Sequence, residues 1–330
     1  MADLSTKYMG MDLKNPIIVG SSGLTESIEK VVQCAEAGAG AVVLKSIFEE
    51  QILHEVGKLA KASDVSYWHS EAADYINQYG REHAVDAYVR LMREAKERVS
   101  IPVIASIHCA SVGAWTEFAK RAQDVGVDAL ELNVYVTPAD KRLNARDNEQ
   151  LYVDIVKAVK KAASIPVALK IGRHFSSIPE MATNLGYAGV DALVVFNRFR
   201  RIDFDIEKLE LVPGNLLSTP DEMTVSLRWV SLLSGDVDYD IAATTGIHDG
   251  AGVVKQLLAG ARVVQVCSVL YQRGVGHIRA ILAEVEDWMK RHAYTSIDDF
   301  RGKLSREASK NPAEYERLQF MKASLGRLGR

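Results

Sequence analysis

Cysteine, net positive charge and long apolar runs are all scarce in this chain of 330 residues, and each scarcity excludes a class of protein. The three cysteines, Cys34, Cys109 and Cys267, lie far apart and form no Cys-x-x-Cys pair, which argues against a local zinc or iron–sulfur site. The formal net charge of −3 provides no broad positive field for nucleic acid. No apolar run reaches the roughly 18 residues that a membrane-spanning helix needs.

The N-terminal segment also lacks a targeting signal. Residues 1–10 are polar and mixed, without the apolar core of a secretory signal peptide. An odd, sparse set of thiols fits a reducing compartment. We therefore expect a cytoplasmic protein that binds a small-molecule substrate and neither nucleic acid nor membrane. With 48% hydrophobic residues, the chain is able to form one large core, so we expect residues 1–330 to be a single domain.

Two sequence patterns occur twice at nearly the same spacing. The segment Ser100–Val103 (SIPV) recurs as Ser164–Val167, and Gly126–Leu130 (GVDAL) recurs as Gly189–Leu193. A pattern repeated with its spacing indicates a repeated structural unit, here a strand, a helix and a second strand.

Short apolar runs recur along the whole chain. There are eight of them: Ile17–Val19, Ala41–Leu44, Val103–Ile107, Ala129–Leu132, Val167–Ile171, Ala192–Phe196, Ile241–Ala243 and Val263–Val266. Their continuous rather than alternating hydrophobicity is typical of parallel strands buried on both faces. Amphipathic segments separate them and predict helices at Glu26–Ala37, Ala84–Val99, Trp115–Val125, Glu149–Ala163, Pro179–Tyr187, Glu222–Leu233 and Ala251–Ala259.

Eight such β-α units favour an α/β fold, a closed (β/α)8 TIM barrel. The alternative is a doubly wound sheet, against which no glycine-rich dinucleotide motif follows the first strand. We expect insertions after strand two (46–80) and strand six (199–220), and a C-terminal helical extension over 295–330.

Polar or small residues follow every apolar run. They are Ser21-Ser22-Gly23, Lys45-Ser46, His108-Cys109, Asn133, Lys170, Asn197-Arg198, Thr244-Thr245-Gly246 and Cys267-Ser268. In a TIM barrel these positions meet at the C-terminal ends of the strands, where the chemistry is done. Lys45 and Lys170 adjoin or interrupt apolar segments, and a buried lysine needs a partner, often an anionic ligand. The last two ends precede helices and offer backbone N–H groups that suit a phosphate.

Several of these segments match one known family. They are Asn15-Pro16 with Ser21–Gly23, Lys45-Ser46, Glu131–Asn133, Ala168–Lys170, Asn197, and the stretch from Thr245 to Val266. Together they resemble the dihydroorotate dehydrogenase family from about Leu13 to Leu304. The resemblance implies an FMN-dependent oxidoreductase of pyrimidine biosynthesis that takes hydride from a CH–CH donor. It also implies a homodimer, and the lack of cluster-binding cysteines means that any iron–sulfur path would require a separate electron-transfer partner.

The resemblance also implies roles for individual residues. The backbones of Thr245-Gly246 and Cys267-Ser268 would hold the FMN phosphate, and Lys170 would face N1 and O2 of the flavin, where positive charge stabilises the reduced ring. The remaining predicted cofactor contacts are Ser21, Ser22, Gly23, Lys45, Ser46, Asn133, Asn197 and Thr244.

The substrate half of the family pattern is altered. The family uses a cysteine or serine base in the loop after strand four, and Val136 stands at that position here. A valine cannot move a proton. Tyr135, Thr137 and His69 are candidate replacements, with Lys45 beside the ring and substrate; each is also consistent with an ordinary loop residue.

The function stays open at this point among four alternatives. The first is an FMN oxidoreductase that acts on dihydroorotate or a related cyclic amide, and the second is the same chemistry on a different substrate. The third is a lyase or isomerase that uses Lys45 or Lys170 on a phosphorylated substrate, and the fourth is a flavin-binding protein without turnover. Arg198, Arg200 and Arg201 form a basic cluster that suits either a carboxylate or a solvated loop.

Overall fold

The computed structural model describes residues 2–48, 85–108, 112–136, 144–199 and 202–310, with single positions at 139, 141, 142, 312 and 315. All eight apolar runs form strands at the predicted places. They are β3 (Ile17–Val19), β4 (Ala41–Val43), β6 (Val103–His108), β7 (Ala129–Asn133), β8 (Val167–Ile171), β9 (Ala192–Val195), β12 (Asp240–Thr244) and β13 (Val263–Val266).

These strands close into a barrel. Each pairs in parallel with the next along the chain, and β13 pairs with β3, so that no edge is left among the eight described barrel strands. A short strand β5 (Ile47–Phe48) continues the second position and pairs with the end of β6. The prediction of a (β/α)8 TIM barrel is confirmed.

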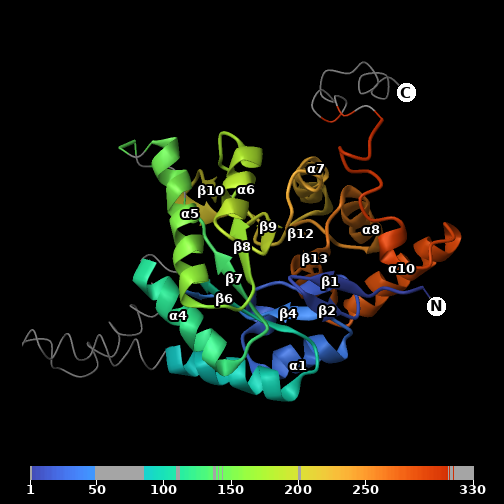
Figure 1. The fold of residues 1–330 in the computed structure, drawn as a ribbon, viewed down its shortest axis with the longest axis horizontal. Coiled ribbons are helices and arrows are strands. Elements are labelled where there is room, and N and C mark those ends of the chain that lie inside the picture. Colours follow the sequence, from blue (N-terminus) through green and yellow to red (C-terminus); the bar gives the residue numbers. More distant parts are fainter. Residues whose placement is uncertain are drawn as a thin grey trace, which may run out of the picture.

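Helices follow the strands and cover the outside of the barrel (Figure 1). The named ones are α1 (Ile28–Glu36), α4 (Val112–Val125), α5 (Ala145–Ala162), α6 (Ile178–Tyr187), α7 (Met223–Leu233), α8 (Gly250–Ala259), α9 (Ser268–Arg273) and α10 (His277–Arg291), and residues 85–98 are also helical. Local signals fix their ends: Asn144 forms a capping box with Asp147 at the start of α5, and Gly260 ends α8 with φ of 112°.

A hairpin that the sequence analysis missed closes the N-terminal end of the barrel. Strands β1 (Thr6–Tyr8) and β2 (Met11–Leu13) pair antiparallel, and the N–H of Met9 donates to the Asp240 carboxylate at the start of β12 (2.7 Å). Tyr8 and Leu13 are buried with small residues inside the barrel, among them Ala129 and Ala168. Small interior residues leave room for the hairpin, so the barrel is closed below and open above.

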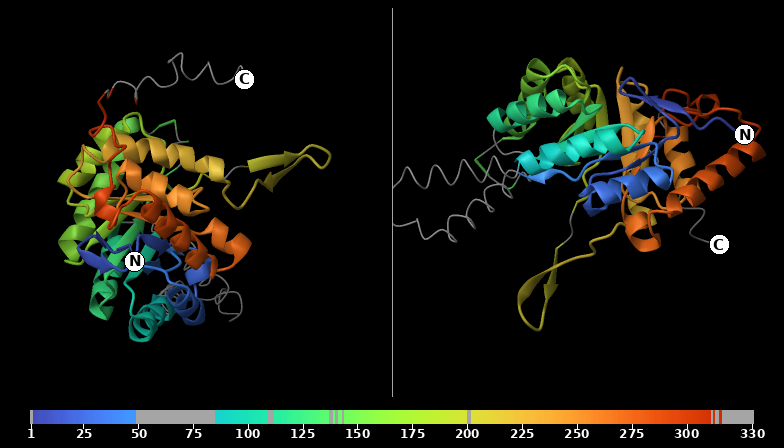
Figure 2. Two further views of the ribbon diagram at one scale, coloured as in Figure 1. Left: turned by 90° about the vertical axis from the view of Figure 1, so that its right-hand side faces the viewer. Right: turned by 90° about the horizontal axis from the view of Figure 1, so that it is seen from below.

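The insertion after strand six contains a second hairpin, β10 (Ile202–Asp205) with β11 (Glu210–Pro213), which extends away from the barrel (Figure 2). Most of the insertion after strand two lies outside the described residues. In the tail, residues 295–310 form a 3₁₀ helix (Ile297–Asp299) and turns. Within the described ranges, no helix combines the length and the apolarity needed to cross a bilayer.

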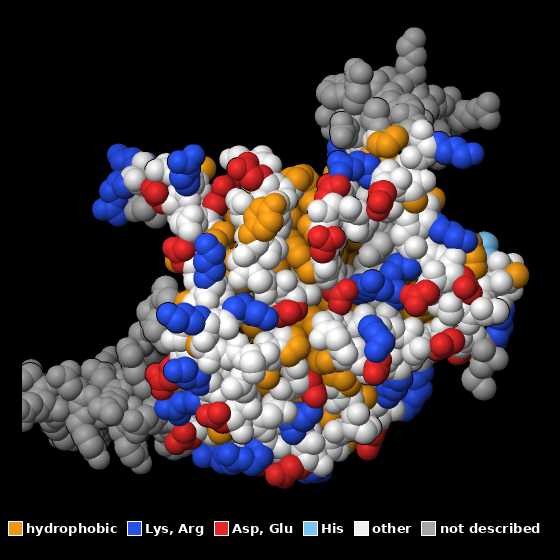
Figure 3. Space-filling view, in the orientation of Figure 1, with side chains coloured by type: hydrophobic (Ala, Val, Ile, Leu, Met, Phe, Trp, Pro, Cys, Tyr) orange, Lys and Arg blue, Asp and Glu red, His pale blue; other side chains and the backbone are white. Residues whose placement is uncertain are grey.

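The surface carries both signs of charge in close alternation on the face seen in Figure 3, with no extended patch of one sign. Apolar side chains are visible there mainly in the recess between α6 and α7. This face therefore provides no field that would steer a polyanion.

Candidate active site

A chain of hydroxyl groups lines one side of the open end of the barrel. The Oγ of Ser46 lies 3.0 Å from Ser21 Oγ and 2.7 Å from Ser106 Oγ, and the N–H of Ser46 donates to Ser21 Oγ at 2.7 Å. The amide Nδ2 of Asn133 donates to Ser46 Oγ at 3.5 Å. Three strand ends, those of β3, β4 and β7, thus meet as predicted.

The side chain of Asn133 has an unused acceptor. Its Oδ1 is buried and has no hydrogen-bond partner in the described structure. Because a buried acceptor without a donor is costly, this atom indicates where a ligand N–H would be stabilised.

Lys170 is held inside the barrel by two polar partners. Its Nζ donates to Gln265 Oε1 at 3.0 Å and lies 3.6 Å from Glu131 Oε1, and Gln265 Nε2 donates to the other oxygen of Glu131. The Lys170 side chain is 12% exposed and that of Glu131 is 1% exposed. Alternation along the strands explains the arrangement, because residues 131 on β7, 170 on β8 and 265 on β13 all point inward.

The ends of β12 and β13 meet at one residue from the loop before α7. The N–H of Ser218 donates to Ser268 Oγ at 2.9 Å, and the N–H of Gly246 donates to Ser218 Oγ at 3.3 Å. Thr245 and Gly246 both have positive φ, 74° and 76°, which turns the backbone sharply after β12. This corner brings together the two segments predicted to hold a phosphate.

Cys267 and the residues after β3 also lie at this corner. The thiol of Cys267 donates to the carbonyl of Gly20 at 3.3 Å, and burial raises its pKa, so it is a neutral thiol. The hydroxyl of Ser22 caps the short 3₁₀ helix Gly23–Thr25 by accepting from the N–H of Leu24.

Lys45 lies at the edge of the open end, bound to another residue. Its Nζ is 2.9 Å from Glu26 Oε2, and both side chains are substantially exposed. Hydrogen bonds from Lys30 and from Lys45 hold the pKa of Glu26 at about 2. Glu26 therefore remains a counter-ion for Lys45 over the whole physiological pH range.

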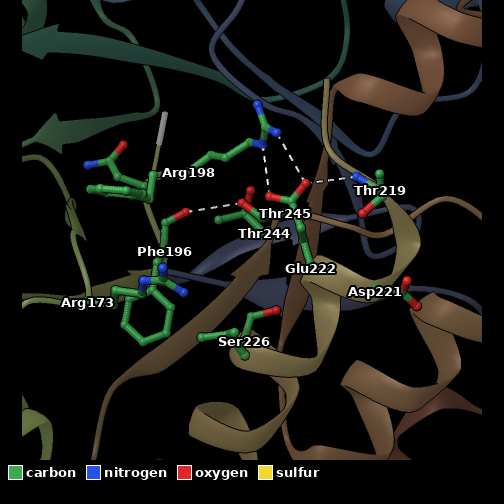
Figure 4. Close-up of a pocket in the computed structure, with 12 residues that line it drawn as sticks. Arg173, Phe196, Arg198, Thr219, Asp221, Glu222, Ser226, Thr244 and Thr245 are labelled. Carbon is green, nitrogen blue, oxygen red and sulfur yellow. Dashed lines mark hydrogen bonds and ion pairs between the residues drawn. The ribbon is translucent and has the colours of Figure 1, made fainter. Parts of the chain in front are cut away.

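A cavity of about 330 Å³ opens beside the ends of β9 and β12 (Figure 4). Arg198 crosses it to form an ion pair with Glu222 (Nε to Oε2, 3.0 Å), and its NH1 and NH2 groups donate to the carbonyls of residues 215–217. The carboxylate that Arg198 binds in this structure belongs to the chain itself. Asn197, at the end of β9, points its Nδ2 toward the carbonyls of Val134 and Lys170 at 3.5 and 3.4 Å.

The loop after β7 contains Val136, at the position where the resemblance predicts the family's base. The N–H of Val136 donates to the hydroxyl of buried Tyr152 at 3.1 Å, which anchors this loop. The ring of Tyr135 lies against Gly172 and makes an edge contact with His174, with ring centroids 6.4 Å apart. His174 in turn contacts Phe199 at 5.2 Å. The sequence analysis missed His174, although its place four residues beyond Lys170 was a usable signal.

Other predicted residues are placed differently or not described. His108 lies with Nδ1 2.6 Å from the carbonyl of Asn133, at the same open end. The predicted base candidates His69 and Thr137 lie outside the described residues, as do Cys109, Arg200 and Arg201.

Comparison with known proteins decides the family. The model of the dihydroorotate dehydrogenase family matches residues 3–289. This chain belongs to the dihydroorotate dehydrogenase family. It is 30% identical over 309 residues to the catalytic subunit of dihydroorotate dehydrogenase B (NAD(+)) from Thermoplasma acidophilum, covering 92% of this chain and 99% of that one.

Two other relatives show the range of the family. The corresponding catalytic subunit from Thermoplasma volcanium is 29% identical over 315 residues, covering 92% of this chain and 98% of the relative. A chloroplastic dihydropyrimidine dehydrogenase (NADP(+)) from Arabidopsis thaliana is 23% identical over 329 residues, covering 91% and 76%. The dihydroorotate dehydrogenase family consists of oxidoreductases that use FMN, so the resemblance inferred from the strand ends is confirmed at the level of the family.

Proposed function

We propose that this protein is an FMN-dependent oxidoreductase that exchanges a hydride with a small cyclic amide, dihydroorotate or a related dihydropyrimidine. The observation that carries the proposal is the position of Lys170, a largely buried ammonium group inside the barrel below its open end. A lysine in this position supplies fixed positive charge where a reduced flavin needs it.

The described residues fit an FMN molecule at three points. The main-chain amides of Thr245 and of Cys267–Ser268 suit the phosphate, and Ser218, which accepts the N–H of Gly246, holds these two segments together. Lys170 suits the N1/O2 edge of the ring. The unpartnered Oδ1 of Asn133 suits a ring or substrate N–H. When bound, FMN supplies a two-electron acceptor whose reduced form carries negative charge along that edge.

The chain must also move a proton at the substrate carbon. Val136 is unable to do so, and Tyr135 is its neighbour on the same loop, with His174 against its ring. We propose that Tyr135 exchanges this proton and that His174 orients the phenol; Thr137 and His69 remain the alternatives. The edge contact fixes the plane of the phenol ring, and a proton donor must be held in position to act.

The substrate is a cyclic amide because the site offers an amide acceptor and hydroxyl groups. The names of the relatives indicate two substrates, dihydroorotate and a dihydropyrimidine. A carboxylate on the substrate needs a cation, and Lys45 and Arg198 are already paired with Glu26 and Glu222. Because these two cations are already paired, the site suits a dihydropyrimidine without a carboxylate at least as well as it suits dihydroorotate.

The test uses the purified chain reconstituted with FMN. Oxidised-flavin absorption that remains after gel filtration supports the cofactor, and a colourless protein that does not take up FMN contradicts the proposal. Anaerobic mixing with dihydroorotate and, separately, with 5,6-dihydrouracil is expected to bleach the flavin with one of them. If neither bleaches it over hours, the proposed substrate class is wrong while FMN binding stands.

We also propose that the electrons leave through a separate subunit, as the name "catalytic subunit" of the relatives suggests. The chain has only three cysteines, too few to hold a four-cysteine cluster alone. In the purified chain, the transfer of electrons from the reduced flavin to NAD⁺ is therefore expected to be far slower than the reduction of the flavin by substrate. Equal rates with the chain alone would contradict the requirement for a partner.

A further inference from the structure

Glu131 is a buried acid with no role in the proposed reaction. Its side chain is 1% exposed, inside the barrel. One carboxylate oxygen accepts from Gln265 Nε2, and the other, Oε1, is buried without a hydrogen bond and lies 3.6 Å from Lys170 Nζ. An isolated buried carboxylate is expensive, so this one is retained only with a compensating charge.

The compensating charge is Lys170. Among the described residues, no second cation lies within ion-pair distance of Glu131. The other ionisable groups that feel its charge are Tyr8, Tyr88 and Cys267, and burial is the largest cause that raises the pKa of each, so all three are neutral. The field of Glu131 therefore acts on Lys170 and on whatever occupies the open end.

The two charges lie at different depths. On the paired strands β7 and β8, Lys170 is level with Asn133, and Glu131 is level with Ala168, one layer deeper in the barrel. The ammonium group is consequently nearer than the carboxylate to a ring bound at the open end. Gln265 bridges the pair, because it donates to Glu131 and accepts from Lys170.

We propose that Glu131 is a counter-charge that sets the reduction potential of the bound flavin by offsetting part of the positive charge of Lys170. The inference rests on the proposed binding of FMN. In a water-poor interior a charge at this depth is weakly screened, so it reaches the ring directly. Glu131 opposes the negative charge that reduction places on the ring, and its removal makes reduction easier.

The experiment is a potentiometric titration of FMN bound to the wild type and to Glu131→Gln, a substitution that keeps the shape and removes the charge. The potential is expected to rise, with the affinity for reduced FMN relative to oxidised FMN increasing at least tenfold, which is about 30 mV for a two-electron couple. An unchanged or lowered potential would overturn the proposal.

A control variant separates the effect of a charge near the flavin from the effect of the net charge of the protein. Asp287→Asn removes one negative charge from an exposed pair with Arg291 on α10 and is expected to leave the potential unchanged. FMN binding by the wild type also separates the role of Glu131 from the proposed function. If the wild type does not bind FMN, the proposed function is wrong. FMN binding with identical potentials in wild type and Glu131→Gln defeats only the role of Glu131.

A double variant keeps the test decisive if Glu131→Gln does not fold. Lys170→Met leaves the Glu131 charge buried alone, whereas Lys170→Met/Glu131→Gln removes both charges. The double variant is expected to have the higher melting temperature as apoprotein, and the higher flavin potential when loaded. Equal melting temperatures and equal potentials for these two variants would show that Glu131 acts on neither Lys170 nor the flavin.

Discussion

The backbone N–H of Ser218 donates to the hydroxyl of Ser268 at 2.9 Å, across 50 residues of sequence. The same Ser218 accepts from the N–H of Gly246 through its Oγ. One serine from the loop before α7 thus connects the backbone that follows β12 with the start of α9. This contact orders the corner assigned to the phosphate.

Ser218→Ala removes the hydroxyl at this corner and keeps the backbone donor. Because the hydroxyl's hydrogen bonds to the Gly246 N–H and to His248 Nε2 are lost, the corner loosens and FMN affinity is expected to fall roughly 2- to 10-fold. Isothermal titration of the apoprotein with FMN measures the change. Ser231→Ala is the matched control, since this buried serine bonds to the Arg228 carbonyl within α7. Equal affinities of both variants for FMN would show that Ser218 does not order the phosphate corner.

Lys170→Ala is expected to lower the reduction potential of bound FMN, because the reduced ring loses its nearest positive charge. It also leaves Glu131 buried without a compensating charge, which costs about 3 kcal/mol of stability. Potentiometry and urea unfolding measure the two effects. Lys160→Ala breaks the more exposed pair with Asp191 on the outside and is expected to leave the potential unchanged. A potential in Lys170→Ala equal to that of the wild type would remove the assigned role.

The barrel was predictable because its strands are buried on both faces and therefore appear as uninterrupted apolar runs. The position of Lys170 was predictable for the same reason, since a charge in such a run must point into the barrel or toward a ligand. The β1–β2 hairpin was not, because segments as short and mixed as Thr6–Tyr8 and Met11–Leu13 have no periodicity to detect.

The sequence predicted which residues lie in the site better than it predicted which residues they bind. Lys45 and Arg198 were correctly located at strand ends, but their counter-ions Glu26 and Glu222 are 19 and 24 residues away along the chain. Contacts of this kind depend on how loops fold over the barrel, which no local pattern records. Ser218 was not among the predicted site residues for the same reason, because its partners Gly246 and Ser268 are 28 and 50 residues away along the chain.

Val136→Cys introduces a thiol at the position where the resemblance predicts the family's base. If the rest of the substrate half is retained, anaerobic reduction of the flavin by dihydroorotate is expected to accelerate roughly 100-fold, the lower range for general base catalysis. Stopped-flow absorbance measures the rate. Val136→Ala changes the volume without adding a proton acceptor and is expected to give no acceleration. Similar rates for both variants would mean that other residues prevent dihydroorotate from binding.

His248 gives the protein a predictable response to acid. It is buried, with Nε2 3.2 Å from Ser218 Oγ, and burial lowers its pKa below the usual 6.5. The imidazole therefore binds a proton more tightly in the unfolded chain than in the folded one. The stability that neutral His248 contributes is complete above about pH 6.5, and it decreases as the pH falls through that value toward the lower pKa of the folded state.

The measurement is the free energy of unfolding in urea at pH 7.5 and pH 5.5, for the wild type and for His248→Gln. The amide of glutamine offers a neutral donor to Ser218 but does not ionise. The variant is therefore expected to lose less stability than the wild type between the two pH values. His277→Gln, at an exposed histidine on α10, is the control and is expected to behave like the wild type. If His248→Gln and the wild type lost equal stability on acidification, His248 would not be a buried neutral group, and the corner around Ser218 would be open to water.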